Sequence, residues 1–399
     1  MGGIGISNGN TWHLNTINPA LLYHNQLSTF EFGLTGESRT LSSDISTSTI
    51  GSGGLKYLGL GIPVTDPVKT DIIWTMAITL SPYSTVNYDV FTFQESPGPE
   101  GDSLVVNRTG TGGLVQASWA HGVKLFKNFS LGVKASYVFG NITRESANQL
   151  FYPEEREVLV GNEIEIDTIY TTDYKIVISE RESYSDWAFE LGAAYKYELS
   201  ETESINLGAT YEFETAIQTE LFSKLERRDA NNSLSGFNAD TLEVGLRGDV
   251  VIPARLGLGI SYSKQNSFTI GFDYLNQNWT NYRSFDQEFT SFQNSHSFAL
   301  GAEFIPDISS AENYLKRITY RFGLEFDKTP YMVQNESINE FGINFGLSMP
   351  VSGFSNVNLA FKYGQLGTTD SGLIKEEYFN FAIGASFNTN RWKKLPRFN

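Results

Sequence analysis

Residues 187–197 read Trp187-Ala188-Phe189-Glu190-Leu191-Gly192-Ala193-Ala194-Tyr195-Lys196-Tyr197. Large apolar side chains occupy alternate positions, and Glu190, Gly192 and Lys196 stand between them. Successive side chains of a β-strand point to opposite faces, so this period of two predicts a strand with one apolar face. The charges on the second face indicate that this face is hydrated.

The same alternation recurs from about Leu27 to the C-terminus, in residues 30–35, 74–81, 131–140, 205–213, 268–274, 318–327 and 379–387. Short connections alternate with longer or polar ones, which we expect near residues 36–53, 84–110, 142–180 and 215–239. Short turns on one side, long loops on the other and an even strand number are typical of bacterial outer-membrane barrels. Counting the up-down pairs gives about fourteen strands, with both termini in the periplasm.

The composition agrees with a transmembrane barrel. Hydrophobic residues make up only 40% of the chain, whereas aromatic residues reach 14% and glycine totals 37. A barrel needs one apolar face per strand and aromatic girdles at both membrane interfaces. No run approaches the roughly 20 apolar residues of a membrane-spanning helix, which argues against a helical membrane protein. A soluble β-sandwich seldom sets Lys, Glu, Asp and Arg opposite so continuous an apolar face, and is disfavoured.

Other classes of function lack their residues. The net charge of -16 argues against nucleic acid as a partner. The chain has no cysteine, and its four histidines are scattered without ligand spacing, so we expect neither a metal site nor a cofactor. Gly5-Ile6-Ser7-Asn8-Gly9 matches the G-x-S-x-G pattern, but the strand-turn-helix elbow and the triad partners of a hydrolase are not visible. We expect no enzyme.

The N-terminal residues do not alternate, and we divide the chain into an N-terminal plug (1–26), a transmembrane barrel (27–390) and a basic periplasmic tail (391–399). Many glycines share the inward parity of the strands, and glycine often marks the close approach of another backbone. We therefore expect Asn18, Pro19 and Ala20 to lie inside the lumen. The alternative, an exposed leader, stays open. No signal peptide is visible, so we infer that the numbering starts after or inside a processed N-terminus, as in a mature outer-membrane protein.

Charged residues of both signs share the inward parity. Such a set usually cross-links a barrel interior, holds a plug and narrows the channel, which makes an open pore the lesser hypothesis. The candidates for these lumen charges are Lys134, Glu190, Lys196, Arg247, Asp273, Glu303, Arg321 and Glu325.

Several motifs resemble the FadL-type barrels, the long-chain fatty acid transporters. They are Met1-Gly2-Gly3-Ile4-Gly5, Asn18-Pro19-Ala20, Tyr57-Leu58-Gly59-Leu60-Gly61-Ile62-Pro63, Ser81-Pro82-Tyr83-Ser84, Gly112-Gly113-Leu114 and Asn278-Trp279-Thr280. The resemblance spans nearly the whole chain and implies a barrel of fourteen strands that takes up small hydrophobic compounds passively, with outer-membrane lipid and a hydrophobic ligand as partners. The short plug, the acidic loops and the basic tail depart from the family. They leave open the alternative of a non-transporting accessory subunit, bound to other protein subunits of an outer-membrane secretion or assembly machine.

Pro82 falls inside the expected third strand, where proline removes a donor of the hydrogen-bond ladder. The resemblance implies a kink at this position that opens a lateral exit towards the bilayer, flanked by Trp74, Met76 and Leu80. The simpler alternative is that the strand ends at Ser81 and Pro82 begins a loop.

Overall fold

The computed structural model describes residues 1–65, 70–95, 102–160, 163–172, 174–229, 232–234, 239–285, 287–288, 291–351 and 355–389. The predicted tail, residues 391–399, lies outside this range. The described residues form strands and four short 3-10 helices: η1 (Pro19–His24), η2 (Trp279–Asn281), η3 (Tyr314–Arg317) and η4 (Asp370–Gly372). No helix in the described residues has the length and apolarity to cross a membrane.

The strands form one antiparallel barrel. Its first half contains β1 (Ser28–Ser42), β2 (Thr47–Pro63), β3 (Ile73–Glu95), β4 (Ser103–Lys124), β5 (Phe129–Val160), β6 (Glu163–Thr171), β7 (Lys175–Glu198), β8 (Glu203–Glu212) and β9 (Thr215–Arg228). The second half contains β10 (Asp240–Ile252), β11 (Arg255–Lys264), β12 (Phe268–Gln277), β13 (Arg283–Ser284), β14 (Gln287–Glu288), β15 (Ser295–Phe304), β16 (Thr319–Val333), β17 (Glu336–Pro350), β18 (Asn356–Leu366) and β19 (Lys375–Thr389). β1 pairs with β19 from Ser28↔Thr389 to Ser42↔Lys375, which closes the barrel.

The barrel wall has 14 strands, as the sequence predicts. β8 and β9 follow one another along the wall, as do β10 and β11, so each pair makes one interrupted strand. Pro253 causes the second interruption, and the side chain of Gln277 donates to its carbonyl at 2.7 Å. β6, β13 and β14 lie outside the count because they belong to extensions of the wall.

The alternation of side chains predicted from the sequence is confirmed. Phe30 and Leu34 are exposed on the outer surface, whereas Glu31 and Gly33 are buried on the lumen side. The outer apolar surface continues across neighbouring strands, where Phe272, Leu300 and Leu324 occupy paired positions. An apolar exterior and a polar interior are what a bilayer requires of a barrel.

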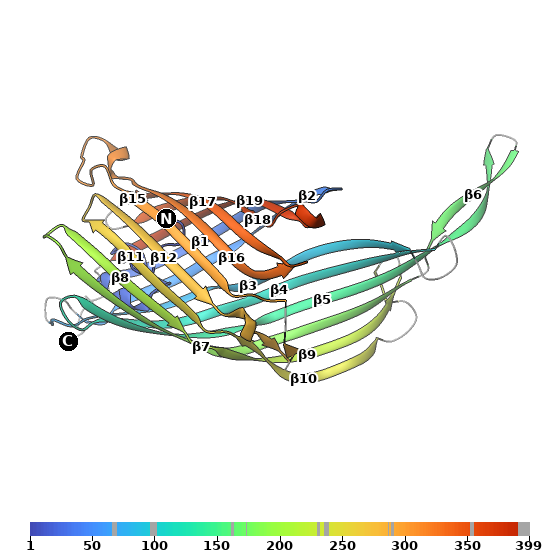
Figure 1. Ribbon diagram of the computed structural model, residues 1–399, viewed down its shortest axis with the longest axis horizontal. Coiled ribbons are helices and arrows are strands. Elements are labelled where there is room, and N and C mark those ends of the chain that lie inside the picture. Colours follow the sequence, from blue (N-terminus) through green and yellow to red (C-terminus); the bar gives the residue numbers. More distant parts are fainter. Residues whose placement is uncertain are drawn as a thin grey trace, which may run out of the picture.

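All four of the long connections predicted from the sequence are wrong, because most of their residues extend the strands, as in residues 36–53, where only 43–46 lie between β1 and β2. β3 continues to Glu95, β5 to Val160, and β9 occupies the first half of residues 215–239. The physical reason is that the outward positions become largely polar beyond the membrane, as at Thr85 and Asn141, so the alternation on which the prediction relied is lost. β3, β4, β5, β7, β9 and β10 thereby form a wall that reaches far beyond the end of β1, β2 and β16–β19, and the β5–β6 hairpin projects from it (Figure 1).

The orientation of the wall predicts where a charge is tolerated. Leu300→Arg places a cation on the lipid-facing surface of β15, where we expect unfolding in lipid vesicles to become easier by roughly 2–4 kcal/mol. Phe222→Arg makes the same change on the outer face of β9 in the extension, where we expect a cost below about 1 kcal/mol, the value near a membrane interface. Denaturant titration of both variants provides the measurement. Equal destabilisation would contradict this orientation.

Candidate functional site

The N-terminal segment (residues 1–26) lies against the inner wall, and glycines bring it close. A Cβ atom at Gly208 would lie 1.9 Å from the carbonyl oxygen of Ile6. A Cβ atom at Gly192 would lie 2.2 Å from Oδ1 of Asn18. Only glycine permits this approach between the two backbones.

Two polar side chains fasten the N-terminal segment. Asp273 on β12 accepts hydrogen bonds from the backbone N–H groups of Gly5 and Ile6, at 2.7 and 2.8 Å. Asn18 donates from Nδ2 to the carbonyl oxygens of Ile6 and Ala193, at 2.7 and 3.1 Å, and its Oδ1 caps η1. The segment is thus tied to strands far apart in the sequence. Pro19 and Ala20 follow Asn18 and are buried beside Gly132, so the three residues singled out from the sequence lie together.

Most of the charges singled out as lumen-facing lie in pairs or line a cavity. Lys134 and Glu190 are 2.5 Å apart, and Arg321 and Glu303 are 3.1 Å apart. Glu325 meets Lys362 at 2.6 Å, and Lys362 also binds Glu340. Lys362 shares the inward parity of the charges predicted from the sequence. Glu340 was not singled out, although the inward parity of β17 could have identified it.

The prediction that Arg247 faces the lumen is wrong. The Arg247 side chain is 85% exposed and lies 3.6 Å from Glu220 on β9. Glu220 alternates with the buried residue Thr219, which places the pair on the outer face. Gly245 has a φ of +66° and the register shifts between Val244 and Leu246, so a bulge inverts the parity that the sequence pattern implied.

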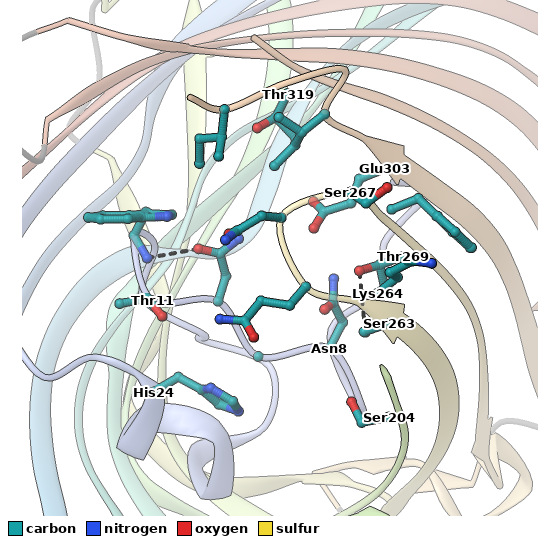
Figure 2. A pocket seen from close by; sticks show the side chains of 18 of the residues that line it. Asn8, Thr11, His24, Ser204, Ser263, Lys264, Ser267, Thr269, Glu303 and Thr319 are labelled. Carbon is teal, nitrogen blue, oxygen red and sulfur yellow. Dashed lines mark hydrogen bonds between the residues drawn. The ribbon is translucent and has the colours of Figure 1, made fainter. Parts of the chain in front are cut away.

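Two cavities adjoin the N-terminal segment. The first cavity has a volume of about 950 Å³. It lies between the N-terminal segment and the wall, at the barrel end where the short turns join β7 to β8, β11 to β12 and β15 to β16. Asn8, Thr11 and His24 reach it from the segment, and Ser204, Lys264 and Glu303 reach it from the wall (Figure 2). Lys196, another of the predicted lumen charges, also lines it.

The second cavity has a volume of about 500 Å³ and reaches β2 and β3 at Lys56, Tyr57, Thr79 and Ser81. We call it the seam cavity, after the boundary between β2 and β3 that is described next. The two cavities share five lining residues, so they are adjacent. These are Asn8, Asn10, His13, Glu303 and Arg321.

The ladder between β2 and β3 is short. It runs only from Pro63↔Thr75 to Leu58↔Leu80. Beyond it, within the described residues, β2 pairs with β1 alone and β3 pairs with β4 alone. We call the whole boundary between β2 and β3 the seam; it has a paired part, from Pro63↔Thr75 to Leu58↔Leu80, and an open part beyond it.

Two bulges flank the point where the seam opens. One lies on β2 at Lys56, where Gly33 pairs with Tyr57 but Leu34 pairs with Leu55. The other lies on β3 at Tyr83, where the register shifts between Pro82 and Ser84. Bulges bend strands and increase their local twist, which accounts for the divergence of β2 and β3. The sequence signalled only the bulge at Pro82; a single extra residue at Lys56 leaves no comparable mark.

The seam opens near the border of the outer apolar surface, on the side where β3, β4 and β5 extend beyond it. Pro82 pairs with Val115, and Val115 pairs with Phe139, whose ring is 38% exposed. The next outward positions on β3 and β5 are polar, Thr85 and Asn141. β3 does not end at Ser81, so the simpler alternative for Pro82 is wrong.

The residues predicted to flank the exit do not all lie at the opening. Leu80 belongs to the last pair of the ladder, next to Pro82. Met76 pairs with Ile62 in the closed part of the seam, and Trp74 lies at the start of β3 with its indole donating to His121. Of the predicted set, only Leu80 and Pro82 border the opening.

An apolar cluster lies on the inner face of the wall beyond the N-terminal segment. Tyr83 and Val86 of β3 pack against it directly after the bulge. Its buried members come from five strands and are Leu114, Val138, Ile142, Tyr184, Ala188, Ile217 and Val250. Beside the open part of the seam the lumen is thus lined by one apolar cluster, whereas around the N-terminal segment charged and polar side chains stand among two smaller apolar clusters.

The two hydrogen bonds to Asp273 allow a test of how firmly the N-terminal segment is held. Asp273→Ala removes the acceptor of two backbone donors, and leaving such buried donors unpaired costs about 1–3 kcal/mol each. We expect residues 1–26 to become sensitive to proteinase K in folded barrels, with mass spectrometry reporting their loss. Asp327→Ala is the matched control, because Asp327 also faces the lumen but binds Ser297. Resistance equal to that of the unchanged protein would contradict the anchoring role.

The fold is similar to several solved structures of low sequence identity. The Pseudomonas putida toluene transporter TodX is 16% identical, with a TM-score of 0.56 over 98% of this chain and 96% of that chain. The Ralstonia pickettii toluene transporter TbuX is 14% identical, with a TM-score of 0.53 over 98% and 97%. A Pseudomonas aeruginosa FadL homologue is 12% identical, with a TM-score of 0.53 over 97% and 96%. The chain is thus a distant FadL-like barrel in its fold.

No curated protein sequence matches the chain. A protein family does: the sequence matches the family described as BamG over residues 1–399. Because this match covers the whole length, the chain belongs to the BamG family.

Proposed function

We propose that the protein is an outer-membrane barrel that takes up small hydrophobic compounds passively and releases them sideways through the seam. The observation that carries this proposal is the end of the β2–β3 ladder at Leu58 and Leu80. In hydrocarbon an unpaired backbone group costs several kcal/mol unless it faces a cavity or a bound molecule. A break at the limit of the apolar surface therefore favours a functional opening.

The apolar cluster offers a surface for such a compound. Tyr83 and Val86 join this cluster to the opening, because Tyr83 is the bulged residue of β3 and Val86 follows it on the same strand. On the periplasmic side, the N-terminal segment acts as a plug, and paired charges such as Lys134 and Glu190 make the lumen unfavourable for an apolar molecule. Exit through the wall avoids that polar region. The names of TodX and TbuX, toluene transporters of the same fold, support this class of compound.

Pro82 provides a test of the opening. Pro82→Val restores a backbone donor and favours a regular strand, so we expect the β2–β3 ladder to lengthen and uptake of toluene by cells to fall several-fold. Pro63→Val is the matched control, since Pro63 lies on the same seam but in its paired part. Unchanged uptake in Pro82→Val, at equal amounts of folded protein, would argue against lateral exit.

A reversible cross-link tests the same exit without removing a proline. The chain has no cysteine, so the double variant Tyr57→Cys/Ser81→Cys carries a unique pair at the next register position beyond Leu58↔Leu80. We expect oxidation to close the seam and lower toluene uptake, and reduction to restore it. Leu60→Cys/Ile78→Cys, in the paired part, should leave uptake unchanged in both states. Equal uptake with the outer pair demonstrably oxidised would contradict the proposal.

A second candidate function is that of an accessory barrel in a larger outer-membrane assembly. The observation that favours it is the lining of the seam cavity, where Glu31, Lys56, Gln116 and Lys134 present polar groups that suit a hydrocarbon poorly. Purification from native membranes in mild detergent, followed by mass spectrometry, separates the two candidates. Stoichiometric subunits support the accessory role, whereas a lone barrel with bound hydrophobic molecules supports uptake.

A further inference from the structure

β3 becomes an edge strand beyond the seam. From Ser84 to Glu95 it pairs with β4, from Ser84↔Leu114 to Glu95↔Ser103. On its other side no strand pairs with it within the described part of the chain. β2 cannot cover this edge where it lies, because Thr47 to Leu55 is held against β1, from Ser42↔Thr47 to Leu34↔Leu55. The separation of β2 from the long β3–β4–β5 wall is visible in Figure 1.

This edge has few of the features that keep strand edges from pairing. Natural edges are blunted by short length, lysine, proline, bulges or a covering loop. Residues 84–95 contain no lysine, arginine or proline, and the bulge at Tyr83 precedes them. Phe91 and Phe93 are 57% and 78% exposed, and Val90 is exposed as well. The segment is thus a long template of β-branched and aromatic residues, held in an extended conformation by β4.

We propose that the free edge of β3, residues 84–95, binds an extended segment of another polypeptide, which adds to the wall as a further strand. A row of backbone donors and acceptors is matched in full by the main chain of another strand, and this mode of recognition uses pockets for alternate side chains as its source of specificity. Asp89 is exposed on this edge and negatively charged, so the bound strand carries apolar side chains in alternation with neutral or basic ones. The proposal does not depend on whether the barrel transports a compound.

The test uses the full-length barrel in detergent and three synthetic peptides with identical side chains. Each is a nine-residue strand of alternating valine and lysine or threonine. One peptide is unmethylated, the second has its backbone nitrogens methylated along one edge, and the third along the opposite edge. We expect at least one edge of the peptide to be indispensable: an unmethylated peptide protects the amides of residues 84–95 from hydrogen exchange, and methylation of the pairing edge weakens binding about tenfold or more. Equal binding of both methylated peptides, or no protection of residues 84–95, overturns the proposal.

A pair of barrel variants places the peptide on β3. Phe91→Lys adds a cation to the free edge and should weaken binding of the basic peptide several-fold, because like charges on paired strands repel. Phe222→Lys is the control, since Phe222 is also exposed on the outer face but lies on β9 between two paired strands. Equal effects of the two variants contradict the location. Native mass spectrometry tests whether a second copy of the barrel occupies the edge instead. Barrel dimers that form through β3 and persist when the peptide is added would overturn the proposal that a different polypeptide binds there.

Discussion

The structure depends on one constraint, which is that backbone hydrogen bonds cannot be left unpaired in hydrocarbon. It requires the ladder to close between β1 and β19, and it requires Gln277 to bind the carbonyl of Pro253 where the wall is interrupted. Against this background the seam stands apart, because there the ladder ends although both strands continue. Function is sought at that exception because the ladder stops there between two strands that both go on, whereas β10 runs on where β12 has ended and there, among the described strands, pairs only with β9 and, at Val250 and Val251, with β13.

The interior follows from the same constraint in a different way. A closed wall leaves a lumen that must be filled. In this chain the N-terminal segment fills one part of it, and apolar side chains of the wall fill another. Around the N-terminal segment, glycines such as Gly208 and carboxylates such as Asp273 receive a second backbone. Beside the open seam, Val138, Ile217 and their neighbours pack as in the core of a soluble protein. The larger apolar cluster begins close to Pro82, where the wall itself changes from paired to divergent strands.

The sequence alone was sufficient for the barrel, its strand number and its lipid-facing side, because the period of two depends on local chemistry that holds at every membrane-spanning strand. It was insufficient where that chemistry changes. Beyond the membrane the outward positions of β3, β5 and β9 are largely polar, so their extensions were predicted as loops. Bulges were the other source of error, because one extra residue at Gly245 inverts the parity of Arg247, and the bulge at Lys56 leaves no signal. The candidate exit was recognised only through proline, the one residue whose effect on a strand does not depend on context.

The way in which the N-terminal segment is enclosed constrains the order of assembly. Met1 and Gly2 lie against Gly323 on β16, and Ile6 lies against Gly208 on β8. Asp273, 267 positions away from Ile6, accepts the backbone hydrogen bonds of Gly5 and Ile6. These contacts join residues more than 200 positions apart, and the contact with Gly323 requires β16 to be in place. Contacts of such long sequence separation are slow to form, so we expect the N-terminal segment to be seated late in folding, after the local hairpins of the wall.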